Sequence, residues 1–181
     1  KYFATPVVRH SVTKKLAALM SIEERLFGMF FEICDLAEGR WNDCDGMDVM
    51  PIYSPHPVEN NIFIFRAMDD DGYKSYAHWA DIVSFDVLEK LLADSPAKDV
   101  LPADYFDSVR RHYLTKASIK KLDSGGGMIH GQPLDFASDM SDKIILAHRA
   151  GPFTRLELEI GSQASFGAVD VLISSGQDYL R

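Results

Sequence analysis

The sequence has little cysteine and no long apolar run, and each absence excludes a class of protein. Two cysteines, Cys34 and Cys44, are too few for a disulfide framework, so we expect free thiols and a cytoplasmic setting. No apolar segment approaches the roughly 18–20 residues that a membrane-spanning helix needs, and no signal-peptide pattern opens the chain. The composition therefore predicts a protein that does not act within a membrane.

An excess of basic residues is also missing. Lys and Arg total 19 against 27 Asp and Glu, which gives a net charge of −8. Affinity for DNA comes mostly from basic side chains that neutralise phosphates, so we expect no direct binding to duplex DNA. Two interpretations of the acidic charge stay open. It keeps the protein in solution, or it lets the protein occupy the DNA-binding surface of a partner.

Familiar catalytic and metal-binding motifs are absent as well. No HExxH, CxxC or Gly-x-Ser-x-Gly occurs, and the histidines are scattered over positions 10, 56, 78, 112, 130 and 148. The stretch Ser124–Gly127 lacks the Lys-Ser/Thr of a phosphate-binding loop, so we interpret it as a linker. His78 and Asp81 could share a helix face as a surface polar pair. We therefore expect no catalytic residue, no metal and no cofactor.

The most strongly patterned stretch that is present runs from Ser21 to Trp41. Ser21 and Glu24 have the spacing of a capping box, and Gly39 can close a helix. Apolar residues recur between them at helical spacing, at Ile22, Leu26, Met29, Phe30, Ile33, Cys34 and Ala37. We predict a long amphipathic helix that organises the core, in which Phe30→Ala would cost about 3–5 kcal/mol.

The elements around it are mixed. Residues 1–10 read as an extended lead-in and 11–20 as a short helix. Residues 48–53 read as an edge strand because of Pro51. A β-hairpin is predicted from strands 61–68 and 73–77, whose turn is Asp69–Gly72. Ser84 and Pro102 mark the starts of two further helices, the second extending as far as Lys121.

After Gly125–Gly127 the pattern changes to strands. Four are predicted, at 128–136, 143–148, 153–160 and 168–174, and the alternating segment LELEI belongs to the third. The predicted fold class is α+β: amphipathic helices with a β-hairpin, followed by a mainly antiparallel sheet section. The division is 1–124 and 125–181, unless both parts form one compact domain.

Two acidic loops are candidate binding residues. Asp43, Asp45 and Asp48 surround Gly46, and Asp69, Asp70 and Asp71 precede Gly72. Neither cluster fits the calcium-loop template, and turn chemistry explains both. The functional alternative is negative charge presented to a protein partner. A separate possibility is that His130 and His148 form a general acid–base pair, as in metal-free nucleases.

Several short motifs occur in the order found in one protein family. They are Phe27-Gly28, Cys34, Gly39-Arg40-Trp41, Met50-Pro51, the run IFIF, Gly72-Tyr73 and the run YFDSVRRHY. In these pieces the chain resembles the ArdB/KlcA antirestriction proteins of plasmids, over residues 20–115. The resemblance implies a protein that blocks type I restriction enzymes, and it brings no catalytic residue with it.

We therefore expect a non-enzymatic anti-defence protein from a mobile genetic element. It would bind and inhibit a host restriction-type complex, or a related complex that targets nucleic acid. Two alternatives stay open. One is a small hydrolase or nuclease that uses His130 and His148, and the other is an accessory protein-interaction domain.

Overall fold

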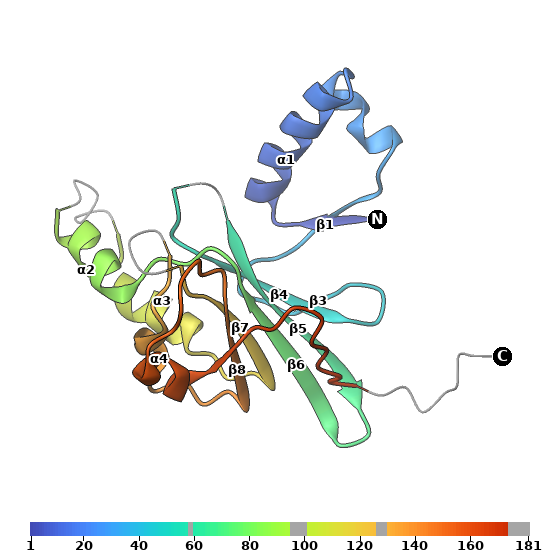
Figure 1. Cartoon of the computed structure of the whole chain (residues 1–181). Coiled ribbons are helices and arrows are strands. Elements are labelled where there is room, and N and C mark those ends of the chain that lie inside the picture. The colour runs from blue at the N-terminus through green and yellow to red at the C-terminus, as the bar shows by residue number, and fades with distance from the viewer. Residues whose placement is uncertain (58–59, 95–100, 126–129, 174–181) are drawn as a thin grey trace.

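A seven-stranded mixed sheet forms the centre of the protein (Figure 1), in a computed structural model that describes residues 1–57, 60–94, 101–125 and 130–173. Its strand order is β3-β4-β5-β6-β7-β8-β9. The strands are β3 (Asn42–Asp43), β4 (Asp48–Tyr53), β5 (Asn61–Asp69), β6 (Gly72–Trp79), β7 (Ile119–Asp123), β8 (Lys143–Ala147) and β9 (Ser162–Gln163). With the helices described below, this confirms the predicted α+β class.

The hairpin β5–β6 is the longest pairing in the sheet and confirms the predicted hairpin. Its register runs from Phe63 opposite His78 to Asp69 opposite Gly72. Gly72 has a φ of +113°, a conformation that glycine adopts without steric cost. The tight turn therefore follows directly from the local sequence.

Pro51 lies in β4, between β3 and β5, and is tolerated there because β3 is short. The β3 pairing covers only the first two residues of β4, Asp48 and Val49. Pro51 itself pairs with Phe63 on the β5 side, and its carbonyl accepts a hydrogen bond from the Gly39 N–H at 2.8 Å. At Pro51, β4 therefore has no paired strand on the β3 side. The missing N–H of proline thus costs no hydrogen bond between strands.

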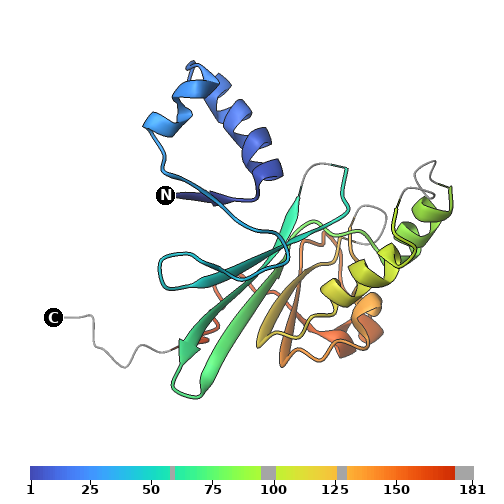
Figure 2. The same cartoon turned by 180° about the vertical axis from the view of Figure 1, so that it is seen from behind.

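From β6 to β9 the strands are parallel, which differs from the antiparallel C-terminal section that the sequence suggests. Parallel strands need crossover connections, and helical segments supply them here. The crossovers contain α2 (Phe85–Asp94), α3 (Tyr105–Tyr113), the 3₁₀ helix η2 (Pro133–Phe136) and α4 (Arg155–Ile160). Helices α2, α3 and α4 gather on one side of the sheet in both views (Figures 1 and 2).

The core lies between this helical layer and the sheet. It includes Ile62, Ile64, Trp79, Leu122 and Leu146 from the strands, with Leu88, Val109, Tyr113 and Phe136 from the helical segments. The ammonium of Lys120 is also buried there, paired with Asp139, and both side chains are fully inaccessible. Burial lowers the pKa of Lys120, and Asp139 opposes that change. A buried ammonium of this kind is tolerated because it is paired.

The N-terminal segment does not form the predicted long helix. Instead, α1 (Pro6–Leu19) is followed by the 3₁₀ helix η1 (Glu24–Met29), and β2 (Ile33–Asp35) pairs in parallel with β1 (Tyr2–Ala4). Both figures show this unit projecting away from the helices on the sheet. The prediction of an organising helix from Ser21 to Trp41 is therefore wrong.

Local backbone chemistry explains the difference. Ser21 has a φ of +54°, its N–H bonds to the Ala18 carbonyl, and the Ile22 N–H bonds to the Ala17 carbonyl. This is a Schellman ending for α1, so Ser21 terminates one helix rather than capping the next. Phe27 is 2% exposed, but Phe30 is 58% exposed, so the apolar stripe is not a continuous core face.

Four further expectations fail after β6. The helix predicted from Pro102 to Lys121 spans only Tyr105–Tyr113, as α3, because Ile119–Asp123 joins the sheet as β7. Residues 155–160 (RLELEI) form a helix whose Thr154 and Glu157 make a reciprocal capping box. Residues 168–173, all described, contain no strand. Residues 133–136 form η2 rather than a strand, and 128–129 lie outside the described residues.

The predicted domain division stays a prediction. The sheet includes strands from both sides of Gly125, since β7 and β8 are neighbours. Both cysteines are free thiols. In the ranges that the structure describes, no helix has the length and apolar character needed to cross a membrane.

Candidate metal centre

Three neighbouring parallel strands place polar side chains at the same edge of the sheet. Asp123 is the last residue of β7, Asp81 comes two residues after β6, and His148 directly follows β8. The carboxyl ends of parallel strands meet at one edge, and ligands of open α/β sheets bind there. His130, from the connection after β7, joins them. Donor atoms of these four side chains all lie within 4.8 Å of one another.

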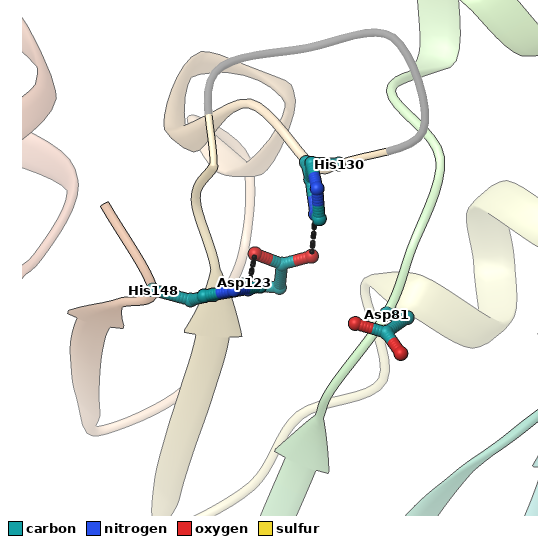
Figure 3. A group of neighbouring side chains, drawn as sticks. All are labelled: Asp81, Asp123, His130 and His148. Atoms are coloured by element: carbon teal, nitrogen blue, oxygen red, sulfur yellow. Dashed lines mark hydrogen bonds and ion pairs between the residues drawn. The ribbon is translucent and has the colours of Figure 1, made fainter. Parts of the chain in front are cut away.

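Asp123 is the centre of the cluster, with a side chain that is fully inaccessible. One carboxylate oxygen is 2.9 Å from Nδ1 of His130, and the other is 3.0 Å from Nδ1 of His148. The Gly125 N–H donates to the second oxygen at 3.2 Å. Figure 3 shows the two imidazoles approaching the carboxylate from different sides. Because a carboxylate only accepts, each imidazole donates from Nδ1 in this arrangement, and an ion bound by the same Nδ1 atoms would take the place of those two protons.

The backbone at His148 is unusual for a residue other than glycine. Its φ is +60°, in the left-handed region, where side chains are uncommon. The neighbouring strand end is fixed by Ser124, whose N–H and hydroxyl both donate to the Ala147 carbonyl, at 3.0 and 2.6 Å. Backbone strain held in place by such contacts is typical of functional sites.

Asp81 completes the cluster from the other side, as Figure 3 shows. Its main-chain carbonyl accepts hydrogen bonds from the Ser54 hydroxyl at 2.9 Å and from the Asn60 amide at 2.6 Å. Both donors belong to the connection between β4 and β5. The position of Asp81 is therefore set by a segment distant in sequence.

The chemistry of these four side chains fits a divalent metal ion. Two carboxylates and two imidazoles are oxygen and nitrogen ligands of the kind that hold zinc and similar ions. Two ligands at about 2.1 Å from one ion are at most about 4.2 Å apart. The four donors, which all lie within 4.8 Å of one another, are therefore close to the spacing that one ion requires.

His78 has a different role from the one the sequence suggests. It lies in β6 rather than on a helix, and its Nδ1 is 2.9 Å from the Tyr76 hydroxyl. Burial lowers the pKa of His78, and the charge of Lys121 lowers it further, while Asp81 opposes both. The interpretation of His78 and Asp81 as a pair on one helix face is therefore wrong.

The six acidic loop residues lie away from this cluster. Asp69, Asp70 and Asp71 are at the turn that begins β6, whereas Asp81 follows the end of the same strand. Asp48 pairs with Arg66 at 2.9 Å. Asp45 pairs with Lys1 at 2.6 Å, and Asp43 accepts the Gly46 N–H at 2.9 Å. The structure brings none of the six to the candidate centre.

Sequence reasoning found His130 and His148 but missed both carboxylates. The sequence predicts no role for Asp123, which lies between the end of a predicted helix at Lys121 and the predicted linker from Ser124, and it places Asp81 on a helix face. A usable signal was present, because Asp81, Asp123 and His148 directly follow three short segments that combine apolar with a few polar residues: YAHWA, IKKL and KIILA. Read as ends of parallel strands, these runs would have placed the three side chains together.

No protein-family model matches the chain, and a search of curated proteins gave no match. Among solved structures, the chain is similar to the metallo-beta-lactamase fold protein YhfI from Bacillus subtilis, with a TM-score of 0.44 and 11% identity. The similarity covers 73% of this chain and 52% of that one, so the chain spans about half the length of that structure. The resemblance to antirestriction proteins is not tested by these comparisons.

The cluster overturns the prediction of a non-enzymatic inhibitor. That prediction rested on the resemblance to antirestriction proteins, on the acidic charge balance and on the absence of any catalytic constellation. Asp81, Asp123, His130 and His148 form such a constellation, at a sheet edge where ligands bind. The histidine-based hydrolase, which stood as the alternative, agrees better with the structure.

Proposed function

We propose that this protein is a hydrolase whose centre binds a divalent metal ion. One observation supports this most directly: Asp81 converges with Asp123, His130 and His148, so that all four donors lie within 4.8 Å. A histidine pair oriented by Asp123 would have no need of a second carboxylate. Four convergent ligands, by contrast, match what a bound ion requires.

In this proposal the four side chains hold the ion and the protein supplies the geometry. A divalent ion provides Lewis acidity to a carbonyl or phosphoryl group of the substrate. In the hydrolysis, the oxygen of water bonds to the carbon or phosphorus, the bond to the leaving group breaks, and the leaving group takes a proton. The side chain of His148 is 59% exposed, so one wall of the centre is open to substrate.

A metal-free hydrolase is a second candidate, favoured by the contacts of Asp123. Its carboxylate orients both imidazoles through Nδ1, with the ring centroids 5.0 Å apart and nearly perpendicular. The two Nε2 atoms would then act as general acid and general base. This candidate predicts full activity in the presence of a chelator, which separates it from the first.

The test is a hydrolysis assay with chelator-treated protein, before and after addition of Zn²⁺ or Mn²⁺. The probes are bis(p-nitrophenyl) phosphate, p-nitrophenyl phosphate and p-nitrophenyl acetate. We expect turnover of at least one probe that needs the added metal. We also expect Asp123→Asn to lower that turnover by at least roughly 10–100-fold, as loss of a metal-site group typically does.

His112→Ala is the matched control, since His112 is an exposed histidine on α3 outside the cluster. It should retain wild-type turnover, whereas His148→Ala should lose it. Activity that is unchanged by the chelator but lost in His148→Ala would replace the metal proposal with the metal-free one. No turnover of any probe, with or without metal, would count against a hydrolase.

A further inference from the structure

We propose that Ser54 and Asn60 are positioning residues that fix Asp81 for metal binding; the inference rests on the metal centre proposed above. Both residues belong to the connection between β4 and β5. The last pair of that hairpin is Tyr53 with Asn61, so Ser54 and Asn60 are the first and last residues of the connection. Neither would be assigned to a site at the ends of β6, β7 and β8 from the sequence alone.

Both side chains bond to the same atom of Asp81. The Ser54 hydroxyl donates to the Asp81 carbonyl at 2.9 Å, and the Asn60 amide donates to it at 2.6 Å. Asp81 lies beyond the last residue of β6, Trp79, so strand pairing does not hold it. These two hydrogen bonds therefore fix the peptide from which the Asp81 carboxylate projects.

Ser54 is itself held by a buried tyrosine. Ser54 and Tyr113 are both 0% exposed, and their hydroxyl oxygens are 2.8 Å apart. The single hydroxyl proton of Ser54 goes to Asp81, so Tyr113 donates to Ser54. Burial raises the pKa of Tyr113 above its ordinary value, which keeps that donor protonated.

The same tyrosine connects the two strands whose ends carry the carboxylates. Its main-chain carbonyl accepts from the Trp79 indole at 2.8 Å and from the Lys120 ammonium at 3.0 Å. Trp79 ends β6, two residues before Asp81, and Lys120 lies in β7, three residues before Asp123. One buried residue thus ties both carboxylate positions together. Such supporting contacts set ligand geometry, and their loss typically lowers metal affinity by roughly 10–100-fold.

The test measures zinc affinity by competition with a chromophoric chelator, alongside the melting temperature of each variant. The variants are Ser54→Ala, Asn60→Ala and the double variant, with Asp81→Asn as the ligand control. Ser118→Ala is the structural control, because its hydroxyl accepts the Ser75 N–H at 3.1 Å near the opposite end of β6 and β7. We expect the double variant to bind zinc roughly 10–100-fold more weakly, and Ser118→Ala to change only the melting temperature.

The outcomes separate the two proposals. Wild-type zinc affinity in the double variant, together with weakened binding in Asp81→Asn, would overturn the positioning role and leave the metal centre intact. Zinc binding that is absent from the wild-type protein would overturn both. If Ser54→Ala fails to fold, Asn60→Ala decides the question, since Asn60 is only half-buried and its loss leaves Ser54 in place.

Discussion

Asp123 orients two of the other three side chains of the candidate metal centre. Its buried carboxylate accepts from two imidazoles and from the Gly125 N–H, so it fixes the orientation of His130 and His148. A buried carboxylate is costly unless its oxygens are satisfied, and here each oxygen has a donor. The arrangement holds ligand side chains in place before any ion arrives.

Gly131 lets the chain pass close enough to Asp123 for His130 to reach it. A Cβ on Gly131 would lie 2.6 Å from the Asp123 carbonyl oxygen and 2.6 Å from a methyl carbon of Ile82. The carbonyl belongs to the sheet backbone and cannot move aside. We therefore expect Gly131→Ala to cost about 1–3 kcal/mol of stability and to weaken metal binding.

Gly151→Ala is the comparison for that substitution. No atom lies within 4 Å of a Cβ at Gly151, which follows His148 by three residues. Urea unfolding should show a change within about 0.5 kcal/mol for Gly151→Ala. Equal effects of the two substitutions would mean that the close approach at Gly131 does not position the site.

Individual elements show where periodicity misleads. The run LELEI alternates like a half-buried strand, yet it is helical because Thr154 and Glu157 cap it reciprocally. The run after Ser21 has helical spacing, yet the chain bends there because Ser21 closes α1. In both places a capping contact at the N- or C-terminus of a helix decides the structure. The hairpin β5–β6 was predictable because its turn residues and its apolar runs agree.

Two phenylalanines near the N-terminus test directly whether residues 21–41 form one continuous helix. Phe27 is 2% exposed and stacks on Phe31 with ring centroids 4.6 Å apart, while Phe30 is 58% exposed. We expect Phe27→Ala to cost about 3–5 kcal/mol, since it leaves a cavity. Phe30→Ala should cost less than about 1 kcal/mol, because its ring already faces solvent.

Thermal and urea unfolding of the two variants would measure this difference. The two phenylalanines are three residues apart, so each substitution serves as the control for the other. A larger loss for Phe30→Ala than for Phe27→Ala would restore the continuous helix and contradict the observed packing.

At the scale of the whole molecule, the candidate metal centre depends on which strands are neighbours in the sheet, and the sequence does not show this order directly. Asp81, Asp123 and His148 are separated by 42 and 25 residues, and only the parallel order β6-β7-β8 brings them together. Local sequence patterns cannot reveal which strands become neighbours. Metal-binding motifs with short spacing, such as HExxH or CxxC, are therefore no guide to this cluster. The α+β class was predictable because it needs only the mixture of elements.

The most direct test of the metal centre is the metal content of the protein. Chelator-treated wild-type protein would be dialysed against dilute Zn²⁺, and the bound zinc per chain would be measured by elemental mass spectrometry. We expect about one zinc ion per chain. The variant His130→Ala/His148→Ala should retain well under that, because it lacks two of the four ligands. Equal zinc contents in the wild-type protein and the double variant would contradict the metal centre.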